Sequence, residues 1–145
     1  MKSLGIRGVV LLVLVFAFAV PAFASTPTEA SGDGWLVAVI EEDGELIAVG
    51  QWDGTFVGEL RHAIGGGRAV KADFVGSVDG REGTLEMLIL KAWGDPTIPG
   101  FHGKWVILSG EGELENLRGQ GTFFFDSYNP LPAGPYEGQI HFDPH

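Results

Sequence analysis

The feature that most constrains the fold is a strand–turn–strand pattern around Asp79-Gly80. Asp-Gly is preferred in a two-residue type I′ turn, because that turn needs positive φ at both central residues. Such a turn fixes the register of the flanking segments 70–78 and 81–90, so pairing can be counted outward from it. One face of the predicted hairpin then carries only apolar or glycine pairs: Val70–Ile89, Ala72–Met87, Phe74–Leu85 and Gly76–Gly83.

The other face of this hairpin is polar and places Asp73 opposite Glu86, with Lys71 diagonal to Glu86. Two carboxylates directly across a ladder repel, which favours either an exposed pair or a functional one. The functional interpretation is an acid/base pair in which one carboxyl has a raised pKa. Because the opposite face is the apolar one, we expect a solvated triad in which Lys71 screens both acids.

The rest of the chain after residue 34 alternates in the same way over shorter segments. Further strand patterns lie at 35–40, 45–50, 55–64, 104–109, 122–125 and 136–143. The long proline-containing segments 93–103 and 126–135 are expected to be surface loops. No 11-residue stretch beyond the N-terminal segment has sustained helical periodicity.

Many short strands with turns every 8 to 12 residues are typical of a β-sandwich or a β-barrel. Leu114 and Leu117, spaced three apart between glycines, predict one helical turn that presses both side chains onto the core. The many glycines provide the corners and close strand approaches that barrel closure needs. We therefore predict an all-β fold, a small antiparallel β-barrel of about eight strands.

The first 24 residues have the pattern of an export signal. Lys2 and Arg7 form a basic start, residues 8–20 are almost wholly apolar, and Ala22-Phe23-Ala24 matches the small-x-small pattern of signal peptidase sites. The apolar run of about 13 residues is shorter than the roughly 20 of a membrane-spanning helix. A retained membrane anchor is the alternative to cleavage after Ala24.

Cleavage after Ala24 predicts three parts: a signal peptide at 1–24, a flexible leader at 25–33 and one β-barrel domain at 34–145. The protein would be secreted or periplasmic. Of the charged residues, seven basic and 19 acidic ones remain after cleavage, a net charge of −12. This charge disfavours nucleic acids and anionic membrane surfaces as partners and keeps an exported protein soluble.

The sequence contains no motif of a known catalytic or cofactor site. It has no cysteine, so thiol catalysis and thiolate metal sites are excluded. It lacks the Gly-x-Ser-x-Gly, His-Glu-x-x-His, P-loop and dinucleotide-binding patterns. His141, Asp143 and His145 alternate and could bind a metal, but Pro144 interrupts the strand and chain ends fray. We expect neither a metal nor a cofactor.

The pattern Gly-x-Gly-x-Leu-x-x-Leu-x-Gly-x-Gly-Thr-Phe, at 110–123, resembles the small barrels of the allene oxide cyclase and dirigent type. Residues 54–143 more closely resemble a bacterial domain family of unknown function grouped with those barrels. The shared parts are the Asp79-Gly80 hairpin, the 113–119 turn and the final segment 136–143. The resemblance implies an allene oxide cyclase-like barrel. Plant members of the wider group are cyclases or guide radical coupling, but their functional residues match no positions here.

Three functions follow from a small exported barrel, whose interior at eight strands is either filled or holds one small ligand. The first is a non-catalytic module that binds a small apolar ligand or a protein partner. The second is a cofactor-independent cyclase or isomerase that acts on a small apolar substrate. The third is a structural or interaction protein with a filled barrel. The candidate ligand-binding residues are mostly aromatic: Trp52, Phe56, Phe74, Glu86, Trp105, Phe124 and Tyr136.

Overall fold

The computed structural model describes residues 26–65, 67–91, 101–128 and 131–144, and every regular element in these ranges is a β-strand. The predicted signal peptide and most of the predicted 93–103 loop lie outside the described residues. No described helix is long and apolar enough to cross a membrane. The strands are β1 Thr28–Glu42, β2 Glu45–Gly54, β3 Phe56–Ala63, β4 Ala69–Val78, β5 Arg81–Lys91, β6 Phe101–Gly112, β7 Leu117–Phe125, β8 Ser127–Tyr128 and β9 Pro132–Phe142.

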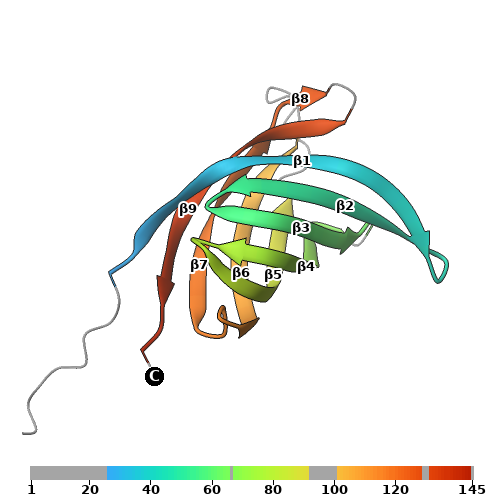
Figure 1. Cartoon of the computed structure of the whole chain (residues 1–145). Helices are drawn as coiled ribbons and strands as arrows, with labels where there is room; N and C mark the ends of the chain where they lie inside the picture. Colours follow the sequence, from blue (N-terminus) through green and yellow to red (C-terminus); the bar gives the residue numbers. More distant parts are fainter. Residues whose placement is uncertain (1–25, 66, 92–100, 129–130, 145) are drawn as a thin grey trace, which may run out of the picture.

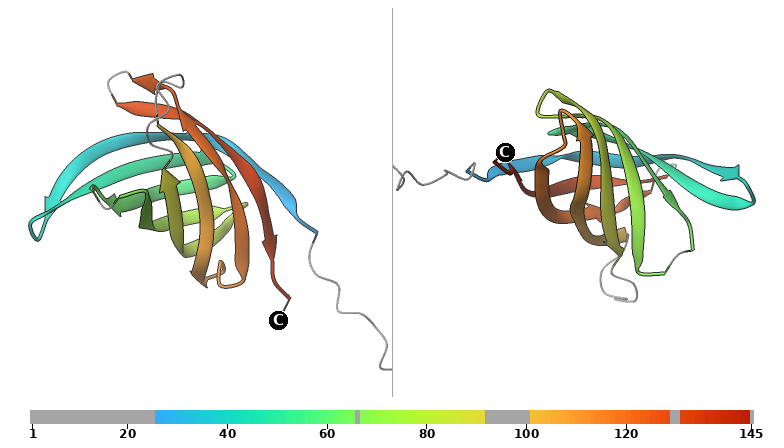
Figure 2. Two further views of the ribbon diagram at one scale, coloured as in Figure 1. Left: turned by 180° about the vertical axis from the view of Figure 1, so that it is seen from behind. Right: turned by 90° about the horizontal axis from the view of Figure 1, so that it is seen from below.

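The strands form one antiparallel sheet that closes on itself (Figure 1). Their order is β1-β2-β3-β4-β5-β6-β7-β9-β8, and an additional pairing of β1 with β9 closes the barrel. Eight strands make the barrel, while the two-residue β8 pairs with the start of β9. The predicted eight-stranded antiparallel barrel is therefore confirmed. Figure 2 shows the hairpin of β1 and β2 extending beyond the neighbouring strands.

The β4–β5 hairpin has the predicted register at every pair, from Val78 opposite Arg81 to Val70 opposite Ile89. Asp79 and Gly80 both have positive φ, at 50° and 80°, as a type I′ turn requires. On the polar face Asp73 lies opposite Glu86, and the Lys71 Nζ lies 3.6 Å from Glu86 Oε1. The Lys71 side chain is 72% exposed, so the triad is solvated and not a buried acid/base pair.

The predicted flexible leader at 25–33 is wrong from Thr28 onward, because β1 begins there. This part of β1 pairs with β9, from Thr28 opposite Ile140 to Trp35 opposite Ala133. The barrel wall is crowded where its small residues lie. Ala30 is buried, and a Cβ on Gly32 would lie only 2.7 Å from the Tyr136 hydroxyl. The barrel domain therefore starts at 28 and not at 34.

The predicted loop at 126–135 is also partly strand, since β9 begins at Pro132. Proline has no N–H for a ladder hydrogen bond, so it is confined to edges and strand ends. The β7–β9 ladder begins only at Tyr136 opposite Phe123, and Pro135 lies just outside it. Pro135 thus lies between the β7–β9 and β8–β9 ladders, Pro132 begins β9 opposite Tyr128, and the prolines do not end the strand.

One end of the barrel is closed by the connection between β6 and β7. Leu114 and Leu117 are both fully buried, as predicted, and the Leu117 N–H donates to the Leu114 carbonyl at 3.1 Å. A Cβ on Gly83 would lie 3.2 Å from Leu114 Cγ, which shows how closely this side chain covers the neighbouring strand. Asp143 N donates to Asn116 O at 2.8 Å and ties the end of the chain to the same turn. Because Leu114 and Leu117 close this end of the barrel, a binding site in the interior has room only toward the opposite end.

Candidate functional site

Aromatic side chains fill the barrel next to its closed end. Trp52 and Tyr136 stack with ring centroids 4.4 Å apart, and Phe56 meets Trp105 edge to face at 5.3 Å. Phe74 meets Phe56 in the same way at 5.7 Å. All five rings are buried. This half of the interior is packed with side chains and has no room for a ligand.

The Tyr136 hydroxyl is engaged in this packing. It donates a hydrogen bond to the Asp53 carbonyl at 2.8 Å and accepts one from the Phe56 N–H at 2.9 Å. Burial raises the pKa of Tyr136, opposed by the hydrogen bond from the Phe56 backbone. A protonated hydroxyl with both roles used ties β9 to the β2–β3 turn, so Tyr136 has a structural role here.

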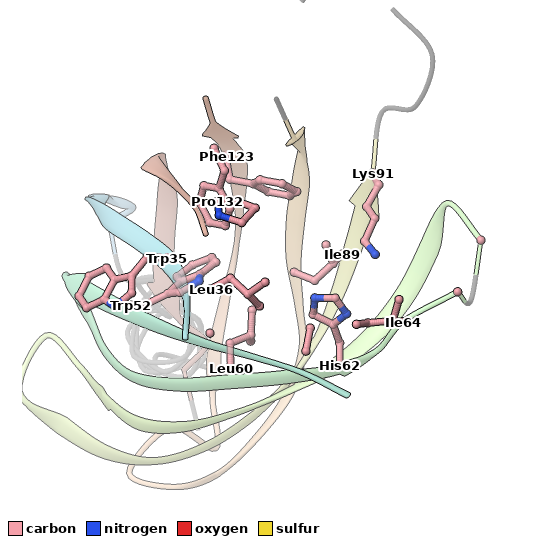
Figure 3. A pocket seen from close by; sticks show the side chains of 15 residues that line it. Trp35, Leu36, Trp52, Leu60, His62, Ile64, Ile89, Lys91, Phe123 and Pro132 are labelled. Carbon is pink, nitrogen blue, oxygen red and sulfur yellow. The ribbon is translucent and has the colours of Figure 1, made fainter. Parts of the chain in front are cut away.

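The other half of the interior is an open cavity of about 480 Å³ (Figure 3). Its wall comes from six of the barrel strands and the segment after β3, and it is mostly apolar. The lining residues are Trp35, Leu36, Ala48, Gly50, Trp52, Leu60, His62, Ile64, Gly65, Gly67, Ile89, Lys91, Phe123, Phe125 and Pro132. Binding pockets for small molecules usually have volumes of about 300–1,000 Å³ and a mainly apolar wall with a few polar groups.

The only titratable side chains among these lining residues are His62 and Lys91. His62 Nδ1 lies 3.0 Å from the Ala63 carbonyl, and a carbonyl only accepts, so Nδ1 carries a proton. Burial lowers the pKa of His62; the Ala63 hydrogen bond opposes this shift and the charge of Lys91 adds to it. Burial also lowers the pKa of Lys91. Figure 3 shows both side chains on the same side of the cavity, next to Ile89 and Ile64.

The structure places the seven predicted site residues at four different locations. Trp52 lines the cavity, whereas Phe56, Phe74, Trp105 and Tyr136 fill the closed half. Glu86 lies on the outer face beside Lys71. Phe124 lines a separate outer groove, where its ring centroid lies 6.1 Å from that of His102.

Sequence analysis missed several residues that do line the cavity, including Leu60, His62, Ile89 and Lys91. The sequence did contain a signal for these residues. Leu60 and His62 alternate on the same strand face as Phe56, and Ile89 and Lys91 lie on the same face of the hairpin as Phe74. The sequence gives no comparable signal for which half of the interior is filled.

The predicted metal candidates at the chain end are engaged with each other. His141 Nε2 lies 3.2 Å from Asp143 Oδ1, and Arg118 Nε lies 3.3 Å from the other oxygen of Asp143. His145 lies outside the described residues. Within the described ranges, no three potential ligand residues come together as a metal site would require.

The fold and its cavity define a small closed antiparallel β-barrel that is filled at one end and open at the other. No family model matches the sequence, and no curated protein is significantly similar to it. One solved structure is similar, that of a protein of unknown function from the DUF3224 family of Shewanella oneidensis MR-1. The TM-score is 0.52 at 18% sequence identity, over 83% of this chain and 99% of that one. An identity this low shows a shared fold alone. The resemblance to allene oxide cyclase barrels stays a prediction.

Proposed function

We propose that this chain is an exported binding protein that holds a small apolar molecule in the open half of its barrel. The observation that supports this is the uneven filling of the interior. The aromatic cluster occupies the closed half, while a cavity of about 480 Å³ remains at the other end. A barrel needed only as a rigid scaffold gains stability from packing both halves, so an unfilled apolar half favours a ligand.

The composition of the cavity sets the kind of molecule. Leu36, Leu60, Ile89 and Phe123 present aliphatic and aromatic surface from four different strands. Burial of apolar surface gains about 25 cal/mol per Å², so a ligand that buries about 200 Å² gains roughly 5 kcal/mol before the costs of binding. Trp35 at the cavity is 37% exposed and Ile64 is 43% exposed, and a ligand would cover part of this surface.

The proposal can be tested with N-phenyl-1-naphthylamine, a neutral apolar dye that fluoresces when it leaves water. The wild-type protein should bind the dye saturably, with one site per chain. Ala48→Phe should weaken binding at least about tenfold, because the cavity-lining Ala48 is replaced by a ring that occupies the ligand volume. Val57→Phe is the matched control, since Val57 is 44% exposed and is not a cavity residue.

Both variants should be compared after their circular dichroism and melting temperatures have been shown to match the wild type. Binding that is absent in the wild type, or equal in Ala48→Phe and the wild type, would contradict the proposed function. Native mass spectrometry of protein purified from its own host should show a co-purified small molecule that Ala48→Phe lacks.

A further inference from the structure

The charge of the cavity is opposite to that of the rest of the molecule. The chain carries 19 acidic and nine basic residues, a net charge of −10. Yet the titratable side chains that line the cavity, His62 and Lys91, are both basic, and no described lining residue is acidic. In an apolar wall, a few polar groups fix the orientation of a ligand and select its head group.

Strand geometry brings these two groups to the open end. His62 lies one residue before the end of β3 and Lys91 is the last residue of β5. Each follows an apolar cavity residue by two positions, Leu60 in β3 and Ile89 in β5, so each side chain points to the interior face. A molecule with its tail against Leu60 and Ile89 would therefore place its head between Lys91 and His62 (Figure 3).

Building on the proposed function, we propose that the ligand is an amphiphile with a carboxylate head that lies against Lys91 and His62 and an apolar tail in the cavity. Lys91 is the lysine among the described lining residues, and its ammonium group attracts an anionic head. A doubly charged head such as a phosphate dianion would cost more to bury in the apolar cavity of a strongly acidic protein, and a cationic head would be repelled by Lys91.

The carboxylate also changes what His62 does. Its neighbours Ala48 in β2 and Ala72 in β4 are apolar, Lys91 is the cation that acts on it, and Arg68 in the β3–β4 connection is exposed. Without a ligand, burial and Lys91 favour the neutral imidazole. A carboxylate beside it favours the imidazolium, so binding takes up a proton. Affinity for the acid should then rise as the pH falls from 8 to 6, where a free carboxyl group is still ionised.

The experiment is displacement of N-phenyl-1-naphthylamine by compounds that share one ten-carbon chain: decanoate, decanol, decylamine and decyl phosphate. Wild type should bind decanoate at least about tenfold more tightly than decanol, although an apolar site without a counter-charge prefers the alcohol. Decylamine and decyl phosphate should be weaker than decanoate. Tighter binding of decyl phosphate would overturn the assignment to a carboxylate.

Single-residue variants test which side chains cause the preference for decanoate and its pH dependence. Lys91→Met should reduce the preference for decanoate over decanol about ten- to hundredfold, whereas Lys91→Arg should keep this preference. Lys71→Met removes the same charge from the outer face of β4 and should change nothing. The wild type should bind decanoate about fivefold more tightly at pH 6 than at pH 8, and His62→Gln should abolish this difference.

The outcomes separate the two proposals. A wild-type protein that binds neither the dye nor decanol would contradict the proposed function itself. Intact dye binding with no preference for decanoate would overturn only the carboxylate assignment. An equal loss in Lys71→Met and Lys91→Met, or an unchanged pH dependence in His62→Gln, would also overturn it.

Discussion

Glycines in this barrel are required for two different physical reasons, which are separable residue by residue. At Gly80 the reason is backbone conformation: φ is +80° and an added Cβ would have no atom within 4 Å. At Gly138 the reason is space, because an added Cβ would lie 2.6 Å from Trp105 Cζ2. A glycine required for positive φ can be predicted from the Asp79-Gly80 dipeptide. A glycine required for space cannot, because the ring that it accommodates comes from a distant strand.

Gly80→Val should lower the free energy of unfolding by about 1–3 kcal/mol, because a β-branched residue strongly resists positive φ. Open space around the position means that a clash adds nothing to this cost. Gly80→Asn is the control and should cost much less, since asparagine tolerates this conformation. Urea denaturation of the three proteins measures the difference. Equal stability of Gly80→Val and the wild type would contradict the turn assignment.

At the scale of elements, the closed half depends on two strands that approach each other without side chains. Gly121 of β7 lies opposite Gly138 of β9, and the Trp105 ring from β6 covers the pair. A bulky aromatic side chain on one strand is thus accommodated by paired glycines on the next two. Gly58 of β3 likewise lies opposite Gly76 of β4, where a Cβ on either glycine would meet the backbone of the other strand.

Gly138→Ala should therefore destabilise the barrel by about 3 kcal/mol through overpacking. Its new methyl group would meet both the Gln120 carbonyl and the Trp105 ring. Gly50→Ala is the matched control: its nearest atoms would be 3.4 and 3.7 Å away, and a change within about 0.5 kcal/mol is expected. Guanidinium denaturation followed by tryptophan fluorescence gives both values. A Gly138→Ala protein as stable as Gly50→Ala would argue against close packing under Trp105.

Local signals explain which elements could be predicted. The β4–β5 hairpin was predictable to the residue, because its turn and its alternation lie within 70–90. The first residues of β1 and of β9 were not, because their small residues and prolines resemble a loop. Pairing with other strands makes them regular: the first residues of β1 pair with β9 and β2, and those of β9 pair with β1 and β8.

The sequence predicts an apolar barrel interior as the candidate site, but not which interior residues line the cavity. Alternation in the β4–β5 hairpin correctly identified Phe74 as an interior residue. Whether an interior residue fills the core or lines a cavity depends on summed side-chain volumes around the whole barrel, which no single segment contains. The candidate residues were chosen because they are large and aromatic, and most of them therefore lie in the filled half. The smaller residues Ala48 and Gly50 line the open half.

At the scale of the molecule, a barrel of eight strands encloses too little space for both a complete aromatic core and a ligand. This chain divides the interior along its axis, with the Leu114 turn at one end and the cavity at the other. Under the proposed function, Trp52, Leu60, Ile89 and Phe123 would serve both stability and binding, because they belong to the core cluster and line the cavity. Substitutions of lining residues outside this cluster, such as Ala48, should alter binding at smaller cost to folding than substitutions in the aromatic half.

Export is a property of the whole chain and remains a prediction. Signal cleavage after Ala24 should give a mature protein that begins at Ser25, from the Ala22-Phe23-Ala24 pattern. Intact mass of the protein recovered outside the cytoplasm measures this directly. Ala24→Asp should block processing, because signal peptidases need a small residue there, while Ser31→Asp should not. Exported protein that still carries Met1 would contradict the prediction.

The pairing of β1 with β9 has a consequence for how the chain reaches its structure. The Thr28 hydroxyl contacts the Ile140 carbonyl across 112 residues of sequence, so β1 can pair with β9 only after β9 has been synthesised. Until then β1 and β7 both present unpaired edges, which are the usual sites of association between chains. Closure at such a separation is slow compared with local hairpin formation. Before β1 pairs with β9, association between chains is therefore expected at the edge of β1, and barrel closure removes that edge.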